Sequence, residues 1–236
     1  MSGSLVSPEL RTRVRGLAVP IARGFGRLGL TPNHLTLIGF GLAIVAAWAA
    51  ASQAWLAAGI LVLVGGVFDL FDGALARATG RANRLGAFMD SVFDRWGEGV
   101  VYVGIAWGAA NAGFVEGAVL ATAALASAVM VSYTRAKSES LGFTPGTGMA
   151  NIGLAPREVR IALLAVGLIG VGLWGHIGPI GPTIWTCPSE LLSCVAPDRY
   201  VGGDIALAAT LGLITLLATI TTIQRILHVR GQAREG

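Results

Sequence analysis

Residues 68–96 read FDLFDGALARATGRANRLGAFMDSVFDRW, and two pairs of aspartates in this stretch decide how the chain is interpreted. Asp69 and Asp72 are three residues apart at the end of one apolar run, and Asp90 and Asp94 are four residues apart at the start of the next. On a helix, both spacings place the two carboxylates on the same face. Because the stretch between the pairs is short and polar, we expect the chain to turn back there, so that four carboxylates converge.

Four carboxylates this close repel one another strongly in a medium of reduced dielectric constant. They persist if they are protonated or if a cation neutralises them. A set of ligands made only of oxygen suits Mg²⁺, Mn²⁺ or Ca²⁺, whereas Zn²⁺ prefers His or Cys. We therefore expect Mg²⁺ (or Mn²⁺) here, with two ions, an arrangement typical of phosphoryl transfer. The alternative is that the aspartates cap helices or pair with Arg77 and Arg95.

The rest of the composition indicates a membrane protein. Of 236 residues, 54% are hydrophobic and 13% are charged, and the mean hydropathy is +0.69. Soluble domains carry about a quarter charged residues. Intrinsic disorder, a nucleic-acid-binding module and an ordinary cytosolic enzyme all fit this composition poorly. The net charge of +4 follows from short basic clusters at the ends of apolar runs, so we expect no nucleic-acid partner and contact with anionic lipids instead.

The apolar runs predict an all-α integral membrane protein with six transmembrane helices. A helix that spans the bilayer needs roughly 20 mostly apolar residues. The six runs of this kind cover 33–53, 54–76, 86–111, 114–140, 157–176 and 202–228. We expect residues 1–236 to form one domain, with the six-helix bundle at 33–228.

The N-terminal segment 1–30 is predicted to lie in the membrane interface. Within it, residues 8–27 alternate apolar and basic side chains at helical spacing, which is typical of an amphipathic helix on the bilayer surface. This segment has no long apolar core and no small-residue cleavage site, so we expect no cleavable signal peptide.

Basic residues predict which side of the membrane each loop faces. With six spans, sixteen of the seventeen Lys and Arg residues fall on one side, and only Arg199 falls on the other. Cytoplasmic loops carry the excess of positive charge, so the chain is predicted to be a multi-pass protein of the cell membrane with both termini and the aspartates cytoplasmic. The loop 177–201 is then extracytoplasmic, where Cys187 and Cys194 can form a disulfide or remain free thiols. The sixteen basic residues on the predicted cytoplasmic side are Arg11, Arg13, Arg15, Arg23, Arg27, Arg77, Arg81, Arg84, Arg95, Arg135, Lys137, Arg157, Arg160, Arg225, Arg230 and Arg234.

The spacing around the aspartates follows the pattern D-x2-D-G-x2-A-R-x8-G-x3-D-x3-D. It resembles the signature of the CDP-alcohol phosphotransferases, which are six-helix membrane enzymes. These enzymes move a phosphatidyl-type group from a CDP-linked donor to an alcohol and release CMP. The matching residues are Asp69, Asp72, Gly73, Ala76, Arg77, Gly86, Asp90 and Asp94.

The resemblance implies a role for each matching position. Asp69, Asp72 and Asp90 hold the divalent metal ions and Asp94 contributes to the second. Asp94 is also the general base that deprotonates the acceptor hydroxyl. Asn33 is equally compatible with a helix N-cap alone. The residues that the resemblance assigns to the donor, CDP-diacylglycerol, are Asn33, His34, Leu35, Thr36, Gly73, Arg77 and Asn83.

A second set of basic residues points to a phosphorylated acceptor. This set resembles that of the actinobacterial phosphatidylinositol-phosphate synthases, which implies inositol phosphate as the acceptor. The alternatives are glycerol 3-phosphate as in phosphatidylglycerophosphate synthase, basic residues that act only as topology signals, and a cation transporter that uses the aspartates. Abundant glycine permits close helix packing and a homodimer. The acceptor residues are predicted to be Arg135, Lys137, Arg157, Arg160 and Arg225.

Overall fold

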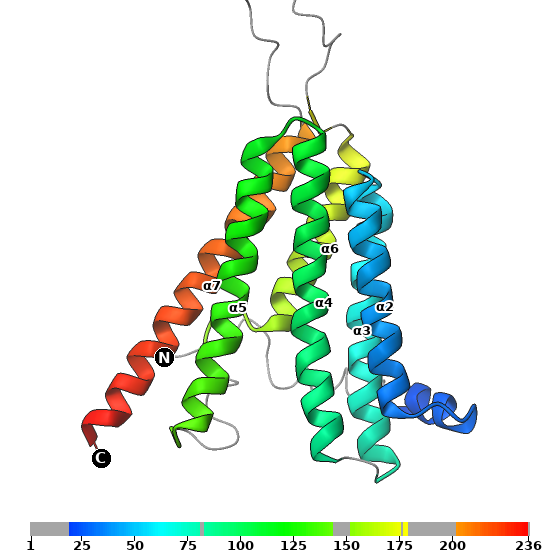
Figure 1. Cartoon of the computed structure of the whole chain (residues 1–236), viewed down its shortest axis with the longest axis vertical. Coiled ribbons are helices and arrows are strands. Elements are labelled where there is room, and N and C mark those ends of the chain that lie inside the picture. Colours follow the sequence, from blue (N-terminus) through cyan, green and yellow to red (C-terminus); the bar gives the residue numbers. More distant parts are fainter. Residues whose placement is uncertain (1–18, 81–82, 144–151, 176, 179–201, 236) are drawn as a thin grey trace, which may run out of the picture.

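Six long helices form a closed ring in the computed structural model of the chain (Figure 1). The structure describes residues 19–80, 83–143, 152–175, 177–178 and 202–235, and these residues contain no strand. Each helix packs against two neighbours, in the order α2, α3, α6, α7, α5, α4 and back to α2. A shorter helix covers residues 19–27. The long helices are α2 (Pro32–Ala51), α3 (Trp55–Ala78), α4 (Arg84–Asn111), α5 (Val115–Ser140), α6 (Arg157–Trp174) and α7 (Gly202–Glu235).

All six apolar runs predicted from the sequence are helices, and most of their ends differ from the prediction by one or two residues. The largest difference is at α7, which continues to Glu235 although its apolar run ends at 228. The polar stretch after 228 contains Arg, Gln, Ala and Glu and no proline, so the helix can continue beyond the apolar part. The predicted amphipathic helix is described from residue 19 onward, and residues 8–18 lie outside the described part, as do Cys187 and Cys194.

Four of the long helices are long and apolar enough to cross a membrane: α2, α3, α5 and the Gly202–Arg234 part of α7. The other two, α4 and α6, do not meet this condition. Charged residues at 90–98 of α4 and 157–160 of α6 account for the difference. The described part of the fold is therefore all-helical, with four long apolar helices and two others.

Side-chain caps define where two of these helices begin. Thr31 is the N-cap of α2, because its hydroxyl accepts a hydrogen bond from the His34 amide at 3.3 Å and the imidazole of His34 accepts one from the Thr31 amide at 3.4 Å. This reciprocal arrangement is a capping box. Asn33 is therefore not the N-cap, and that alternative is wrong. At α4, Asn83 is the N-cap, and its side-chain oxygen accepts from the Gly86 amide at 2.7 Å.

Glycines bring α2 and α4 close together. A Cβ atom on Gly104 would overlap the carbonyl group of Ala47, and one on Gly108 would overlap that of Ala50. Only a residue without a side chain allows two helix backbones to approach this closely. The contact fixes α4 against α2 and thereby fixes the position of the two aspartates at the other end of α4.

The helices converge at one end of the bundle and spread at the other (Figure 1). At the wide end, a small apolar cluster joins the short helix 19–27 to α2 and α3. Its buried residues are Ala22, Leu35, Ala74 and Leu75. The C-terminal end of α3 and the N-terminal end of α4 lie at this wide end, and both carry the aspartate pairs.

Candidate functional site

The structure brings the four aspartates together. Asp69 and Asp72 lie in the last turns of α3, and Asp90 and Asp94 lie in the first turns of α4. Asp90 lies close enough to Asp69 and Asp72 to interact electrostatically with both, and Asp94 interacts with all three. The two acidic helix faces therefore oppose each other, as the spacing in the sequence predicts.

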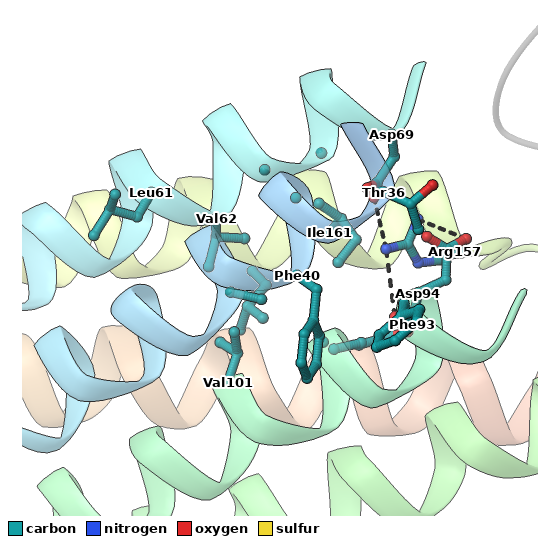
Figure 2. A pocket seen from close by; sticks show the side chains of 17 residues that line it. Thr36, Phe40, Leu61, Val62, Asp69, Phe93, Asp94, Val101, Arg157 and Ile161 are labelled. Carbon is teal, nitrogen blue, oxygen red and sulfur yellow. Dashed lines mark hydrogen bonds and ion pairs between the residues drawn. The ribbon is translucent and has the colours of Figure 1, made fainter. Parts of the chain in front are cut away.

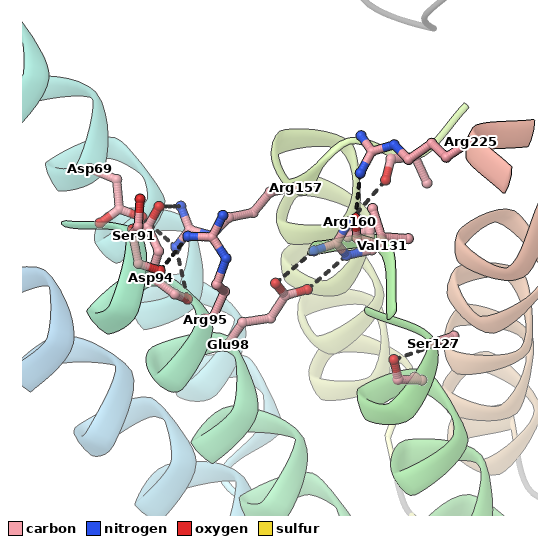
Figure 3. A network of polar contacts seen from close by, with 12 residues as sticks. Asp69, Ser91, Asp94, Arg95, Glu98, Ser127, Val131, Arg157, Arg160 and Arg225 are labelled. Carbon is pink, nitrogen blue, oxygen red and sulfur yellow. Dashed lines mark hydrogen bonds and ion pairs between the residues drawn. The ribbon is translucent and has the colours of Figure 1, made fainter. Parts of the chain in front are cut away.

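Arg157 is the basic residue that pairs with this cluster. One terminal nitrogen of its guanidinium lies 2.7 Å from Asp69 Oδ2, and the other lies 3.2 Å from Asp94 Oδ2 (Figure 3). The first nitrogen also donates to the backbone carbonyl of Asp94 at 3.4 Å. Among the described residues, neither Arg77 nor Arg95 forms an ion pair with the four aspartates, and Arg95 instead donates to the carbonyl of Ser91 in its own helix.

The donor set fits a divalent cation. No three described His, Cys, Asp or Glu side chains stand in the geometry of a formed metal site, and the guanidinium of Arg157 lies between Asp69 and Asp94. Arg157 neutralises only part of the cluster, since neither Asp72 nor Asp90 forms an ion pair with a described Lys or Arg residue. Negative charge thus remains on carboxylate oxygens alone, which is the ligand type that Mg²⁺ and Mn²⁺ prefer.

Residues of α2 hold two of the aspartates. The hydroxyl of Thr36 donates to Asp72 Oδ2 at 2.9 Å and lies 3.2 Å from the carbonyl of Pro32. A Cβ atom on Gly39 would lie 3.0 Å from Asp69 Oδ1, so this glycine leaves room for the carboxylate. Thr36 is almost fully buried. The contact of Thr36 with Asp72 means that its side chain orients an acid of the cluster.

The remaining residues of the predicted donor site lie around the start of α4 and the end of α3. A Cβ atom on Gly86 would lie 3.4 Å from the side-chain oxygen of Asn33, so Asn33 faces the first turn of α4. One on Gly73 would lie 3.3 Å from the guanidinium of Arg77, so Arg77 extends over Gly73. Asn83 and His34 serve as capping residues of α4 and α2, and Leu35 is part of the apolar cluster at the wide end.

The other predicted acceptor residues divide into two groups. Arg160 and Arg225 are buried and their described contacts are with protein groups. Arg225 donates to the carbonyl of Ile152 at 3.1 Å and to that of Val131. Arg135 and Lys137 lie on the last turns of α5, where Arg135 pairs with Glu139 at 2.9 Å. Of the five, Arg157 is the one that touches the aspartate cluster.

A cavity extends from this cluster into the interior of the bundle (Figure 2). Thr36, Asp69, Asp94 and Arg157 line its polar end. Its walls deeper in the bundle are apolar and come from α2, α3, α4 and α6; they include Phe40, Leu61, Val62, Val101 and Leu164. Asp69, Asp94 and Arg157 therefore stand at one end of a mostly apolar cavity.

Glu98 continues the acidic face of α4, and from its spacing in the sequence we expect it to orient an acceptor, to pair with a basic group or to make a structural hydrogen bond. Its carboxylate forms a double hydrogen bond with Arg160 and lines the same cavity as Asp94. Glu98 follows Asp94 by four residues, as Asp94 follows Asp90, so helical spacing alone places all three acids on one face of α4. The expected basic partner is present in the structure, and it is Arg160 on α6, a helix that the sequence alone does not place opposite α4.

Fold and site together define a helical membrane protein with a cluster of charged side chains among its helices. The sequence profile of the CDP-alcohol phosphatidyltransferases matches residues 29–183, and the chain belongs to this family. It is therefore an enzyme of the phosphatidyltransferase type.

Relatives and solved structures are similar over most of the chain. Archaetidylinositol phosphate synthase from Pyrococcus horikoshii is 37% identical, over 67% of this chain and 79% of that protein. Phosphatidylinositol phosphate synthase from Mycobacteroides abscessus is 32% identical, over 85% and 88%. The structure of phosphatidylinositol phosphate synthase from Mycobacterium tuberculosis with CDP-DAG bound has a TM-score of 0.69 at 26% identity and covers 90% of this chain and 92% of that one. The structure of the same enzyme with manganese and citrate has a TM-score of 0.68 at 25% identity and covers 90% and 88%.

Proposed function

We propose that this enzyme transfers a phosphatidyl group from CDP-diacylglycerol to a hydroxyl of inositol phosphate and releases CMP. The family and the names of the relatives support the donor and the acceptor. The observation that carries the proposal is the position of Arg157, which bridges Asp69 and Asp94 at the end of the cavity. It places a permanent positive charge beside the acids, where a phosphorylated acceptor needs one.

Asp69, Asp72, Asp90 and Asp94 are proposed to hold two divalent cations, Mg²⁺ or Mn²⁺. The all-oxygen donor set and its uncompensated negative charge support this assignment, and a related enzyme has been solved with manganese. Bound there, such ions neutralise charge on the diphosphate of the donor and on the departing CMP.

Asp94 is proposed to be the general base. Its carboxylate takes the proton of the acceptor hydroxyl, whose oxygen then forms a bond to the phosphorus atom that carries the diacylglycerol. The bond from that phosphorus to the bridging oxygen breaks, and this oxygen leaves with CMP. The ion pair with Arg157 supports the role, because a guanidinium 3.2 Å away holds the carboxylate in one orientation.

The donor is proposed to bind where α2, the end of α3 and the start of α4 meet. Arg77 lies over Gly73, and its guanidinium can reach phosphate oxygens beside a backbone without a side chain. In this proposal, Leu35 and Thr36 contact the donor from the first turns of α2. In the structure, Leu35 belongs to the apolar cluster at the wide end and Thr36 donates a hydrogen bond to Asp72. The full set remains Asn33, His34, Leu35, Thr36, Gly73, Arg77 and Asn83.

The acceptor phosphate is proposed to bind near Arg157, with Arg135 and Lys137 as further basic groups on α5. Buried Nε of Arg157 has no hydrogen-bond partner among the described residues, so this donor is available to an anion. Arg160 and Arg225, which we also expected at the acceptor, already bind protein oxygens. Their contribution to acceptor binding therefore requires either a change of partners or an indirect role.

We further propose that all six long helices cross the membrane and that the site and both termini face the cytoplasm. Trp48, Trp107 and Trp174 are 71%, 63% and 76% exposed, and they lie near the ends of α2, α4 and α6 at the narrow end of the bundle. Exposed tryptophans at one level are typical of a membrane–water interface. Two of the three stand on α4 and α6, which supports spans for these helices too. We also propose that segment 1–30 lies in the membrane interface. In this proposal residues 1–236 form one domain, and the protein assembles as a homodimer.

An acceptor panel tests the proposed function. Purified protein with CDP-diacylglycerol and Mg²⁺ is given inositol phosphate, glycerol 3-phosphate, free inositol or serine, and CMP release is measured. We expect the highest kcat/KM with inositol phosphate and little release with the two acceptors that lack a phosphate. A preference for glycerol 3-phosphate would reassign the acceptor, and CMP release that is the same with every acceptor would contradict the proposal.

A further inference from the structure

Glu98 and Arg160 form a buried ion pair next to the proposed reaction site. The two guanidinium nitrogens of Arg160 lie 2.9 and 2.8 Å from the two oxygens of Glu98 (Figure 3). The side chain of Glu98 is 4% exposed and that of Arg160 is 0% exposed. A charged pair inside an apolar bundle costs free energy to desolvate, and well-packed apolar residues of similar volume are often as stable. Stability alone is therefore a weak reason for this pair.

The pair joins two helices that are not neighbours. In the ring of helices, α4 packs against α2 and α5, whereas α6 packs against α3 and α7. The side chains of Glu98 and Arg160 reach across the interior to connect α4 with α6. Four residues before Glu98 and three before Arg160, Asp94 and Arg157 form a second ion pair between the same two helices.

The two ion pairs differ in how firmly they are held. Arg160 binds both oxygens of one carboxylate and also donates to the carbonyl of Ala155 at 3.0 Å. The amide of Ala155 in turn donates to the hydroxyl of Thr221 on α7 at 2.9 Å. Arg157, by contrast, is 26% exposed and divides its guanidinium between acids on two helices. Arg160 is thus fixed to α4 and to the turn that leads into α6, while Arg157 stands one turn earlier in α6, at the edge of the cavity.

We propose that Glu98 and Arg160 are a positioning pair for the reaction. Their bidentate contact sets the register of α6 against α4, so that Arg157 stands beside Asp94 and its Nε faces the acceptor phosphate. The inference rests on the proposed function, because it requires that Arg157 bind the acceptor. It gives Arg160, which is bound to Glu98, a role that needs no direct contact with substrate.

Three variants separate positioning from stability. Glu98→Gln and Arg160→Met each remove one charge and leave the other buried without its partner, so both are expected to lower the melting temperature of the purified protein. The double variant Glu98→Leu/Arg160→Met removes both charges and keeps the interior filled. It is expected to melt close to the wild type. Leu168→Ala is the control, because Leu168 is a buried residue of α6 outside the site and its loss lowers stability alone.

The KM values decide between the two roles. We expect the double variant to raise the KM for inositol phosphate at least about tenfold, with the KM for CDP-diacylglycerol changed by less than about twofold. Leu168→Ala should melt at a lower temperature and keep both KM values. Arg160→Lys, which keeps the charge but not the bidentate contact, should show an intermediate KM for the acceptor.

Wild-type kinetics in the double variant, or equal increases of both KM values, would overturn the positioning role. If the wild-type protein itself does not use inositol phosphate, the proposed function fails. If it does and the double variant matches it, only this inference fails.

Discussion

The guanidinium of Arg157, at the start of α6, lies 2.7 Å from the carboxylate of Asp69, near the end of α3. This contact places a fixed positive charge inside a cluster of four acids. Any divalent cation that binds the same oxygens competes with this charge or is repelled by it. Arg157 is therefore expected to weaken the binding of the metal ion and to strengthen the binding of the acceptor phosphate.

Replacing Arg157 with Ala should raise the affinity of the protein for Mn²⁺. Removal of one nearby positive charge is expected to lower the dissociation constant about five- to tenfold, which corresponds to on the order of 1 kcal/mol. Mn²⁺ binding to the purified protein, followed by electron paramagnetic resonance, measures this directly. Arg230→Ala, at an exposed position of α7, is the control for loss of charge in general. Weaker Mn²⁺ binding by the Arg157 variant would show that the guanidinium organises the acids instead of competing for them.

Asp94→Asn should abolish transfer and leave the fold intact. The amide cannot accept the proton of the acceptor hydroxyl, and loss of a general base lowers the rate by about 10²–10⁴-fold. We expect CDP-diacylglycerol to bind the variant in the presence of Mg²⁺ with nearly unchanged affinity, as measured by protection of the protein against thermal unfolding. Turnover near the wild-type rate would exclude Asp94 as the base.

Local spacing accounts for the parts of this site that the sequence predicts. The intervals between Asp69 and Asp72 and between Asp90 and Asp94 fix the helix face of each acid, because helical geometry depends only on position along the chain. The six apolar runs predicted the six long helices for the same reason. The closed order of the helices, in which α6 follows α3, is set by packing between distant segments and was not predicted.

The partners of the arginines follow from that order of helices. Arg157 and Arg160, three residues apart on one helix, were both predicted to bind the acceptor. In the structure, Arg157 points to Asp69 and Asp94, whereas Arg160 points to Glu98. Sequence spacing shows that two side chains share a face, but the acids of the opposing helix determine which partner each one meets.

Thr36→Val should lower activity although it removes none of the proposed metal-binding carboxylates. The variant keeps the volume of the side chain but loses the 2.9 Å hydrogen bond to Asp72. Loss of a group that orients a metal-binding carboxylate costs about 10–100-fold in metal affinity or activity. We expect kcat/KM to fall by this factor and the apparent Mg²⁺ requirement to rise. Thr36→Ser keeps the hydroxyl and should retain most of the activity, so an equal loss in both variants would point to packing as the cause.

Gly104→Ala should destabilise the protein. The new Cβ would overlap the backbone carbonyl of Ala47, and forced overpacking of this kind costs about 1–3 kcal/mol. Gly41→Ala, on α2, is the matched control, because a Cβ at Gly41 meets no atom within 4 Å. Thermal unfolding of the two purified variants should show a clear loss for Gly104→Ala and none for Gly41→Ala. Equal melting temperatures would contradict the close approach of α2 and α4.

In the proposed reaction, the acceptor oxygen attacks the phosphorus atom that carries the diacylglycerol. The direct measurement uses inositol phosphate labelled with ¹⁸O in its attacking hydroxyl, together with CDP-diacylglycerol, Mg²⁺ and the purified protein. Mass spectrometry should find a phosphatidylinositol phosphate that retains the label, together with unlabelled CMP. Phosphatidate accompanied by a cytidylyl adduct of inositol phosphate would show attack at the other phosphorus, and the absence of any lipid containing inositol phosphate would contradict the proposed activity itself.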